Sequence, residues 1–235
     1  MSLIFTLLQK DYIVLAADNR HTRGDREGSY INDNGIKVVE ILNGRGVLGF
    51  AGQDFGEQIV FPAKLKGLLD KEQDLVTTAF ELTEYAREIY KPALEQANPP
   101  VVQMLMAAFH NWNGKSIATS ILLESHFFIP NPAEYPYRRF EVIGKSGHGA
   151  LYGLHRFGNR DLDIDVALRL SALILFEICE FDISVGGDPQ IYVIPREGEC
   201  KKQGKEMTDG LIEWASGVGL SLDRLVMQPH PSVKC

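Results

Sequence analysis

Cysteine is scarce in this sequence, and its few cysteines are not arranged to form a disulfide framework or a zinc site. Cys179, Cys200 and Cys235 are three in number, far apart, and include no CxxC pair. This pattern argues against disulfides and structural zinc as the source of stability. A chain of 235 residues can bury a sufficient core without them. Cys179 lies in the apolar run LILFEICEF and is predicted to be a core residue.

A basic surface and a long hydrophobic run are also missing. The formal net charge is -7, which argues against nucleic acid as a partner, because phosphate binding needs a basic face. The longest apolar run, residues 170–176, is too short to span a bilayer and lies between Arg169 and Glu177. Lys10 and Asp11 interrupt the apolar N-terminal stretch, which does not have the pattern of a signal peptide. Together with the isolated thiols, this predicts a soluble cytoplasmic protein with no membrane partner.

Common catalytic and ligand-binding motifs are absent as well. The sequence contains no GxxxxGK[ST] phosphate loop, no GxSxG nucleophile elbow and no HExxH zinc motif. The histidines share no metal-ligand spacing; they are His21, His110, His126, His148, His155 and His230. We therefore expect neither a metal nor a cofactor.

The hydrophobic pattern that is present begins with strands. Residues 3–9 and 12–17 are continuous apolar runs, which suit strands buried on both faces. Residues 18–35 are polar and rich in turn residues. Two further strands are expected at residues 36–42 and 45–52, joined by an Asn-Gly hairpin signal. Short hairpins in succession predict an antiparallel sheet.

The rest of the chain alternates between helical and strand patterns. Helices are predicted at residues 56–69 and 74–97, the second with Asp74 as its N-cap, and residues 101–112 are interpreted as a further helix. The remaining elements, in chain order, are strands at residues 116–125, 138–144 and 149–154, a helix at 164–181, a strand at 190–195 and a helix at 205–215. We predict one α+β domain over residues 1–235, a four-layer αββα sandwich of two antiparallel sheets flanked by helices.

Four segments carry a more specific signal. They are KDYIVLAADNRHT (residues 10–22), GIKVVEILNGRGVLGFAG (35–52), IGKSGHGALYGL (143–154) and FDISVGGDPQIYVI (181–194). In their order and character they resemble the motifs of proteasome β-type subunits and bacterial proteasome-like peptidases, which are N-terminal nucleophile hydrolases. The resemblance implies the αββα fold. The chain starts directly on the first strand, as in the β type, without the helical extension of α-type subunits.

The resemblance implies a nucleophile at the start of the chain. In this family the hydroxyl of the first residue of the mature chain attacks, and its own α-amine is the general base. An ungapped alignment of the KDxxVLAAD stretch places Ser2 where the family has threonine. Removal of Met1 would free the Ser2 amine, whose ordinary pKa of about 7.7–8.0 suits a base at neutral pH. Serine is also a common second residue, so the alternative that Ser2 has no role stays open.

The resemblance further assigns a carboxylate and a lysine. Asp18, the last residue of the AAD triplet, matches the carboxylate that holds the active-site lysine, and Lys37 matches that lysine. A buried lysine beside Ser2 would lower the pKa of the Ser2 amine and stabilise the alkoxide. The alternatives are a turn aspartate paired with Arg20 and an exposed lysine at a sheet edge.

Four further positions bear on the implied site. Gly52 matches the glycine whose N–H forms the oxyanion hole, although a strand-to-helix turn would also explain a glycine there. Ser146 and Asp182 match two supporting polar residues. Val185 stands in place of a supporting serine, and valine can neither donate nor accept a hydrogen bond.

These residues favour a peptidase that cleaves peptides or unfolded proteins inside a self-assembled homo-oligomeric ring. The resemblance implies an ATP-dependent unfoldase as a further partner. Val185 and the serine in place of threonine favour instead a catalytically inactive ring subunit. A third hypothesis is an N-terminal serine amidase that acts on a small molecule.

Overall fold

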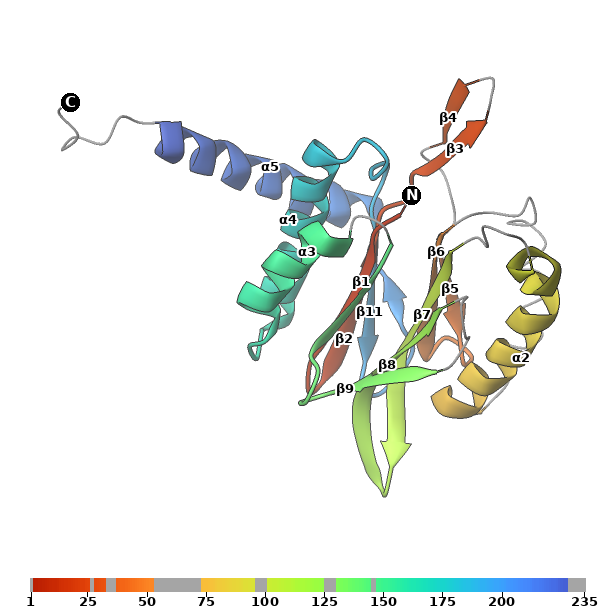
Figure 1. The fold of residues 1–235 in the computed structure, drawn as a ribbon. Coiled ribbons are helices and arrows are strands. Elements are labelled where there is room, and N and C mark those ends of the chain that lie inside the picture. Colours follow the sequence, from red (N-terminus) through yellow and green to blue (C-terminus); the bar gives the residue numbers. More distant parts are fainter. Residues whose placement is uncertain are drawn as a thin grey trace.

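The computed structural model describes residues 2–25, 28–32, 37–52, 73–95, 101–124, 130–144 and 147–227. Within them lie two five-stranded antiparallel sheets and a separate two-stranded hairpin (Figure 1). The hairpin consists of β3 (His21–Asp25) and β4 (Gly28–Asn32) and falls in the stretch that the sequence marks as turn-rich. The predicted helix at residues 56–69 lies outside the described residues.

The first sheet holds the start of the chain at its centre. Its order is β10-β1-β2-β11-β12, and every pairing is antiparallel. The strands are β1 (Ile4–Leu8), β2 (Tyr12–Ala17), β10 (Phe140–Ile143), β11 (Gln190–Pro195) and β12 (Lys201–Lys202). Strands β1 and β2 are buried on both faces, as their continuous apolar runs predict.

The second sheet has the order β5-β6-β7-β8-β9. Its strands are β5 (Val38–Ile41), β6 (Gly46–Gly52), β7 (Val102–Trp112), β8 (Lys115–Glu124) and β9 (Asn131–Glu134). The β5–β6 hairpin turns at Asn43 and Gly44, both with positive φ, as the Asn-Gly signal predicts. The edge strand β9 contains Pro132, which suits an edge position.

Helices cover the outer face of each sheet, so the layers follow the order helix, sheet, sheet, helix (Figure 1). Helix α2 (Leu75–Leu94) packs on β7 and β8. On the other side lie α3 (Gly147–Gly153), which continues into the π-helical turn η1 (Leu154–Gly158), then α4 (Ile164–Phe181) and α5 (Lys205–Met227). Helix α4 packs on β2, and α5 packs on α4. The α+β sandwich with two antiparallel sheets and flanking helices is the predicted fold class.

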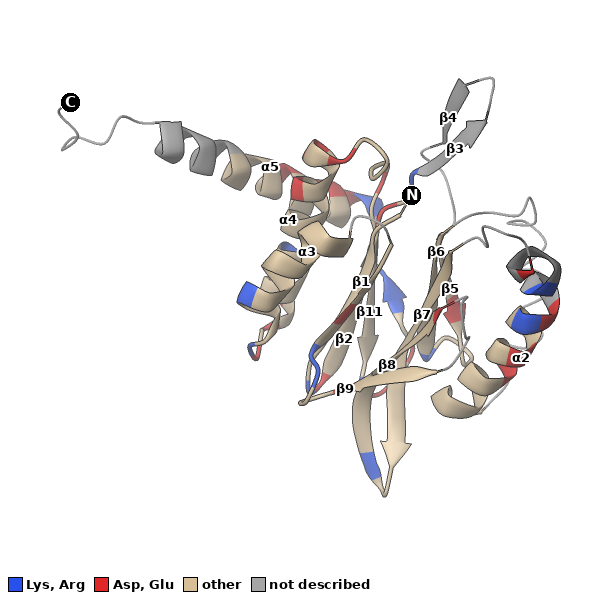
Figure 2. Ribbon diagram, viewed as in Figure 1, with Lys and Arg blue, Asp and Glu red and all other residues tan. Residues whose placement is uncertain are grey.

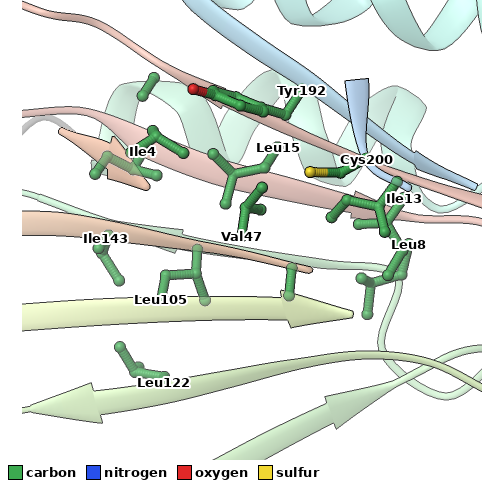
Figure 3. Close-up of a cluster of buried hydrophobic side chains, with 14 of the residues drawn as sticks. Ile4, Leu8, Ile13, Leu15, Val47, Leu105, Leu122, Ile143, Tyr192 and Cys200 are labelled. Carbon is green, nitrogen blue, oxygen red and sulfur yellow. The ribbon is translucent and has the colours of Figure 1, made fainter. Parts of the chain in front are cut away.

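Three apolar clusters hold the layers together. The cluster between the sheets joins Ile4, Ile13 and Leu15 of the first sheet to Val47 and Leu105 of the second (Figure 3). A second cluster lies between the β5–β9 sheet and α2, and a third lies between the other sheet and helices α3 and α4. Charged residues lie mostly on the helices and at strand ends, while the strands are largely uncharged (Figure 2). This distribution is the one that burial of both sheets requires.

Two element predictions are wrong. The segment predicted as a helix at residues 101–112 contains strand β7 instead: Met104 and Met106 face the α2 cluster, while Leu105 and Ala107 face the other sheet. A strand buried on both faces is apolar at every position and cannot be told from a buried helix by periodicity. Residues 149–154, predicted as a strand, lie in α3 and η1, where Ala150 and Leu154 are buried at helical spacing.

Other predicted elements are found where the pattern places them. Helix α2 begins as expected after Asp74, whose Oδ1 accepts the N–H groups of Val76 and Thr77 at 2.9 and 3.0 Å. Helix α5 extends to Met227, well beyond the predicted end at residue 215. No helix among the described residues combines the length and the apolar character needed to cross a membrane.

Candidate active site

The carboxylate of Asp18 joins four segments of the chain at the end of β2. Its Oδ1 accepts the backbone N–H of Leu3 at 2.8 Å and the ammonium of Lys37 at 2.7 Å. Its Oδ2 accepts the backbone N–H groups of Arg20 and Gly186, each at 3.2 Å. Both carboxylate oxygens are therefore satisfied, which is the condition under which a buried carboxylate is tolerated.

Lys37 is buried beside Asp18, with only 2% of its side chain exposed against 1% for Asp18. Its carbonyl accepts the N–H of Phe50, which ties the residue to β6 just before β5 begins. The exposed edge lysine is therefore not what the structure contains. Burial lowers the pKa of Lys37 below its ordinary value of 10.5, and the negative charge of Asp18 opposes this shift without overcoming it.

Ser2 directly precedes Leu3, the residue that the Asp18 carboxylate binds, and it is buried, with 6% of its surface exposed. The following residue, Leu3, donates its N–H to the Asp18 carboxylate and accepts the N–H of Asp18 at 3.1 Å. Gly144 packs against Ser2 from the other side. Its φ is +100°, and a Cβ placed on it would lie 1.9 Å from the Ser2 carbonyl oxygen, so only glycine fits there.

The loop between α4 and β11 is bound to the end of β2 by backbone groups. The carbonyl of Gly186 accepts the N–H groups of Asn19 and Arg20 at 3.1 and 2.9 Å. The Arg20 guanidinium donates to the carbonyl of Ile183 at 2.9 Å and of Val185 at 3.4 Å. The alternative prediction paired Asp18 with Arg20 in a turn. The structure contains such a contact through the backbone N–H of Arg20, while the Arg20 guanidinium binds the carbonyls of the α4–β11 loop.

Asp182 and Val185 occupy this same loop. Asp182 Oδ1 accepts both the N–H of Ser184, at 2.9 Å, and the Ser184 hydroxyl. Val185 is fully buried and packs in the cluster beneath α4. Where the resemblance expects a serine, the structure therefore holds an apolar side chain, and the hydroxyl of the loop belongs to Ser184 one residue earlier.

Gly52 ends strand β6 with a φ of +125°, and a Cβ on it would lie 2.2 Å from the Val101 carbonyl oxygen. This close backbone approach explains the glycine without reference to a substrate. Gly52 as an oxyanion donor therefore stays a prediction. Ser146 lies outside the described residues, as does Met1.

A pocket of about 240 Å³ opens beside Asp18 on the helical side. Apolar side chains make up most of its wall, among them Leu175 and Ile212 of the two C-terminal helices, and Cys179 lines it as well. Cys179, predicted as a core residue, is only partly buried; burial and the charge of Asp18 raise the pKa of its thiol to about 11. Among the described residues, no three His, Cys, Asp or Glu side chains are grouped to hold a metal ion.

Some residues that contact Asp18 and Ser2 were not predicted from the sequence. The backbone N–H of Gly186 donates to Asp18, although the two residues are 168 positions apart in the sequence. Such a backbone contact cannot be recognised from the residue types. The Oε1 of Gln103 accepts the N–H of Gly144 at 2.8 Å, while its side-chain amide donates to Glu124 at 2.6 Å. Gln103 lies in β7, the segment misassigned as a helix. Gly144 and Gly186 do lie within two of the four segments that carry the family resemblance.

The stacked antiparallel sheets and the flanking helices define an αββα sandwich. Among solved structures, the chain is similar to Anbu (ancestral beta-subunit) from Yersinia bercovieri, with a TM-score of 0.75. The sequences are 16% identical, and the likeness covers 99% of this chain and 100% of that chain. At this identity the likeness concerns the fold alone. No family model and no curated protein matches the sequence.

Proposed function

We propose that the chain is a proteasome-like N-terminal nucleophile hydrolase that cleaves peptide bonds with Ser2 after removal of Met1. The observation that carries the proposal is the shared carboxylate. Asp18 Oδ1 holds Lys37 Nζ at 2.7 Å and the N–H of Leu3 at 2.8 Å, so the lysine and the residue after Ser2 meet at one atom. Such a shared contact fixes the position of Ser2 relative to the ammonium.

The chemistry begins at the Ser2 hydroxyl. Its Oγ forms a bond to the carbonyl carbon of the substrate while the Ser2 α-amine takes up the hydroxyl proton. The amine then passes that proton to the leaving nitrogen as the carbon–nitrogen bond breaks. Water attacks the resulting ester by the same proton transfers, which releases the acyl product and restores Ser2.

Lys37 supplies the electrostatics of this step. A positive charge beside the Ser2 amine disfavours the protonated amine, lowers its pKa and leaves more of it free to act as a base. The same charge stabilises the developing alkoxide. Asp18 keeps the ammonium in place, and we assign the backbone N–H of Gly52 to the oxyanion. Asp182 and Ser146 are proposed as supporting residues.

A homo-oligomeric ring with peptides or unfolded proteins as substrates is part of the proposal, as is an ATP-dependent unfoldase that feeds them. Support comes from the proteasome-like fold and from the family motifs in the sequence. These expectations concern assembly, and they are separable from the chemistry at Ser2.

Hydrolysis of a fluorogenic peptide by untagged wild type, Ser2→Thr and Ser2→Ala tests the proposal. We expect Ser2→Thr to retain activity and Ser2→Ala to lose at least about a thousandfold in kcat, because alanine has no nucleophile. Equal activity of wild type and Ser2→Ala would overturn the assignment. A small-amide panel run beside the peptide separates a peptidase from an amidase.

A catalytically inactive ring subunit is the second candidate. Val185 favours it, because its fully buried side chain offers no hydrogen bond beside the site. Ring assembly on a sizing column, with Met1 removed and no hydrolysis, would support this candidate over the peptidase.

A further inference from the structure

A second pocket, of about 580 Å³, lies at the opposite end of the sheets from Asp18. Strand β2 ends at the Asp18 carboxylate and starts beside Lys10, and β11 leads away from the site loop to Arg196. The remaining walls come from residues 114–118 of the β7–β8 hairpin and residues 134–137 after β9. In Figure 1 the tip of this hairpin points away from the end of the sheets at which the N-terminus lies.

The lining of this pocket is basic in a chain whose net charge is -7. Lys10, Lys115 and Arg196 line it, against the single carboxylate of Glu134. Neither lysine has an ion-pair partner among the described residues. The guanidinium of Arg196 lies 3.5 Å from the Asp11 carboxylate in a pair that is largely open to solvent. Three cations thus line one concave place, and the nearby carboxylates of Glu134, Asp11 and Asp161 offset only part of their charge.

Tyrosine rings supply the rest of the binding surface. Two contacts hold the Tyr135 side chain in position. Its hydroxyl donates to Asp161 at 3.0 Å, and the Arg139 guanidinium lies 4.9 Å from the centre of its ring. Its backbone N–H donates to the carbonyl of Ala118, which joins the two walls. Tyr137 stands at the rim with 94% of its surface exposed. An exposed ring beside unpaired ammonium groups offers a face for stacking next to a site for negative charge.

We propose that this pocket binds a small, multiply charged anion that carries an aromatic ring, of the nucleoside polyphosphate class. The volume is within the range of about 300–1,000 Å³ that is usual for small-molecule sites. Lys10 and Lys115 contact the phosphates, and the exposed ring of Tyr137 contacts the base. The chain has no phosphate loop, so side chains and not a helix N-terminus provide the recognition. This site is independent of Ser2 chemistry.

Calorimetric titration of the full-length protein at low ionic strength tests the proposal with three probes: ATP without magnesium, inorganic tripolyphosphate and adenosine. Saturable binding of ATP is expected, with tripolyphosphate weaker and adenosine undetected. Low salt is needed because exposed charges are screened over about 8–10 Å at physiological ionic strength.

Paired variants locate the binding. Lys10→Gln/Lys115→Gln should weaken ATP by about tenfold, because it removes two exposed ion pairs. Lys91→Gln/Lys201→Gln removes the same charge away from the pocket and should leave binding unchanged. Tyr137→Ala should weaken ATP and not tripolyphosphate. The proposal is overturned by absent saturable binding at millimolar ATP, by equal loss in both lysine pairs, or by tripolyphosphate binding as tightly as ATP.

Discussion

The ammonium of Lys37 and the carboxylate of Asp18 lie 2.7 Å apart, with both side chains almost wholly removed from solvent. Burying two charges costs free energy that their attraction only partly offsets. An ion pair of this kind is weak evidence for stability, and its position beside the residue that follows Ser2 gives it a functional explanation. Several measurements can separate these two roles.

The first prediction concerns protonation. The pKa of Lys37 should lie below 10.5 because burial disfavours the ammonium, whereas that of the exposed Lys205 should lie above it because of its hydrogen bond to Asp188. Carbon NMR of the lysine side chains across a pH titration measures both. Asp18→Asn should lower the Lys37 pKa further, since it removes the opposing charge. A Lys37 value above that of Lys205 would contradict the account.

The same shift has a consequence for stability. Because the Lys37 pKa is lower in the folded protein, unfolding takes up a proton at pH values between the folded value and the ordinary value of 10.5. Lys37 should therefore make the free energy of unfolding rise with pH inside that window. Comparing the pH dependence of urea unfolding for wild type and Lys37→Met isolates this contribution.

The second prediction concerns the pair itself. Lys37→Met leaves the Asp18 carboxylate buried without a cation and should reduce the free energy of unfolding by about 3–5 kcal/mol. Lys37→Met/Asp18→Asn should cost less than the sum of the single changes, because neither charge is then left alone. Urea unfolding of the four proteins measures the coupling. Additive losses would show that the two side chains do not interact.

The third prediction uses two glycines with the same φ of +100°. Gly144→Ala brings a Cβ into the Ser2 carbonyl and should displace Ser2, with a loss of peptide hydrolysis of about a hundredfold. Gly198→Ala introduces the same backbone strain where no atom lies within 4 Å of the new Cβ. It should lower stability slightly and leave activity intact. Equal activity of the two variants would contradict the placement of Ser2.

The fourth prediction concerns the start of α2. Asp74→Ala removes the acceptor for two backbone N–H groups and should cost about 1 kcal/mol of stability. Asp74→Asn keeps an acceptor oxygen and should cost much less. Thermal unfolding of both variants checks the difference, and an equal loss would mean that the charge of Asp74, not its hydrogen bonds, stabilises the helix.

The sequence predicts a strand correctly where clear turn signals bound it. It does not separate a strand from a helix where the element is buried on both faces. The Asn-Gly turn locates the β5–β6 hairpin, and the apolar runs of β1 and β2 lie where expected. The helix predicted at residues 101–112 is wrong because apolar residues on both faces of β7 hide the alternation of a strand. The two-residue strand β12 is too short to produce any pattern.

For the candidate site, the resemblance selects the charged side chains and misses the backbone around them. Asp18 and Lys37 stand out because a carboxylate at a strand end and a lysine before a strand match a known pattern. The partners that hold Asp18, such as the N–H of Gly186, come from contacts across the whole chain. No local pattern specifies such a contact, since every non-proline residue carries the same donor.

The intact mass of the untagged protein, before and after incubation with a peptide epoxyketone, tests the central claim most directly. This inhibitor class closes a ring only with an amine and a hydroxyl on the same N-terminal residue. The account predicts a mass lacking one methionine and a single adduct, mapped to Ser2 and absent in Ser2→Ala. A protein that has lost Met1 and forms no adduct, or one that keeps Met1, would contradict Ser2 as the nucleophile.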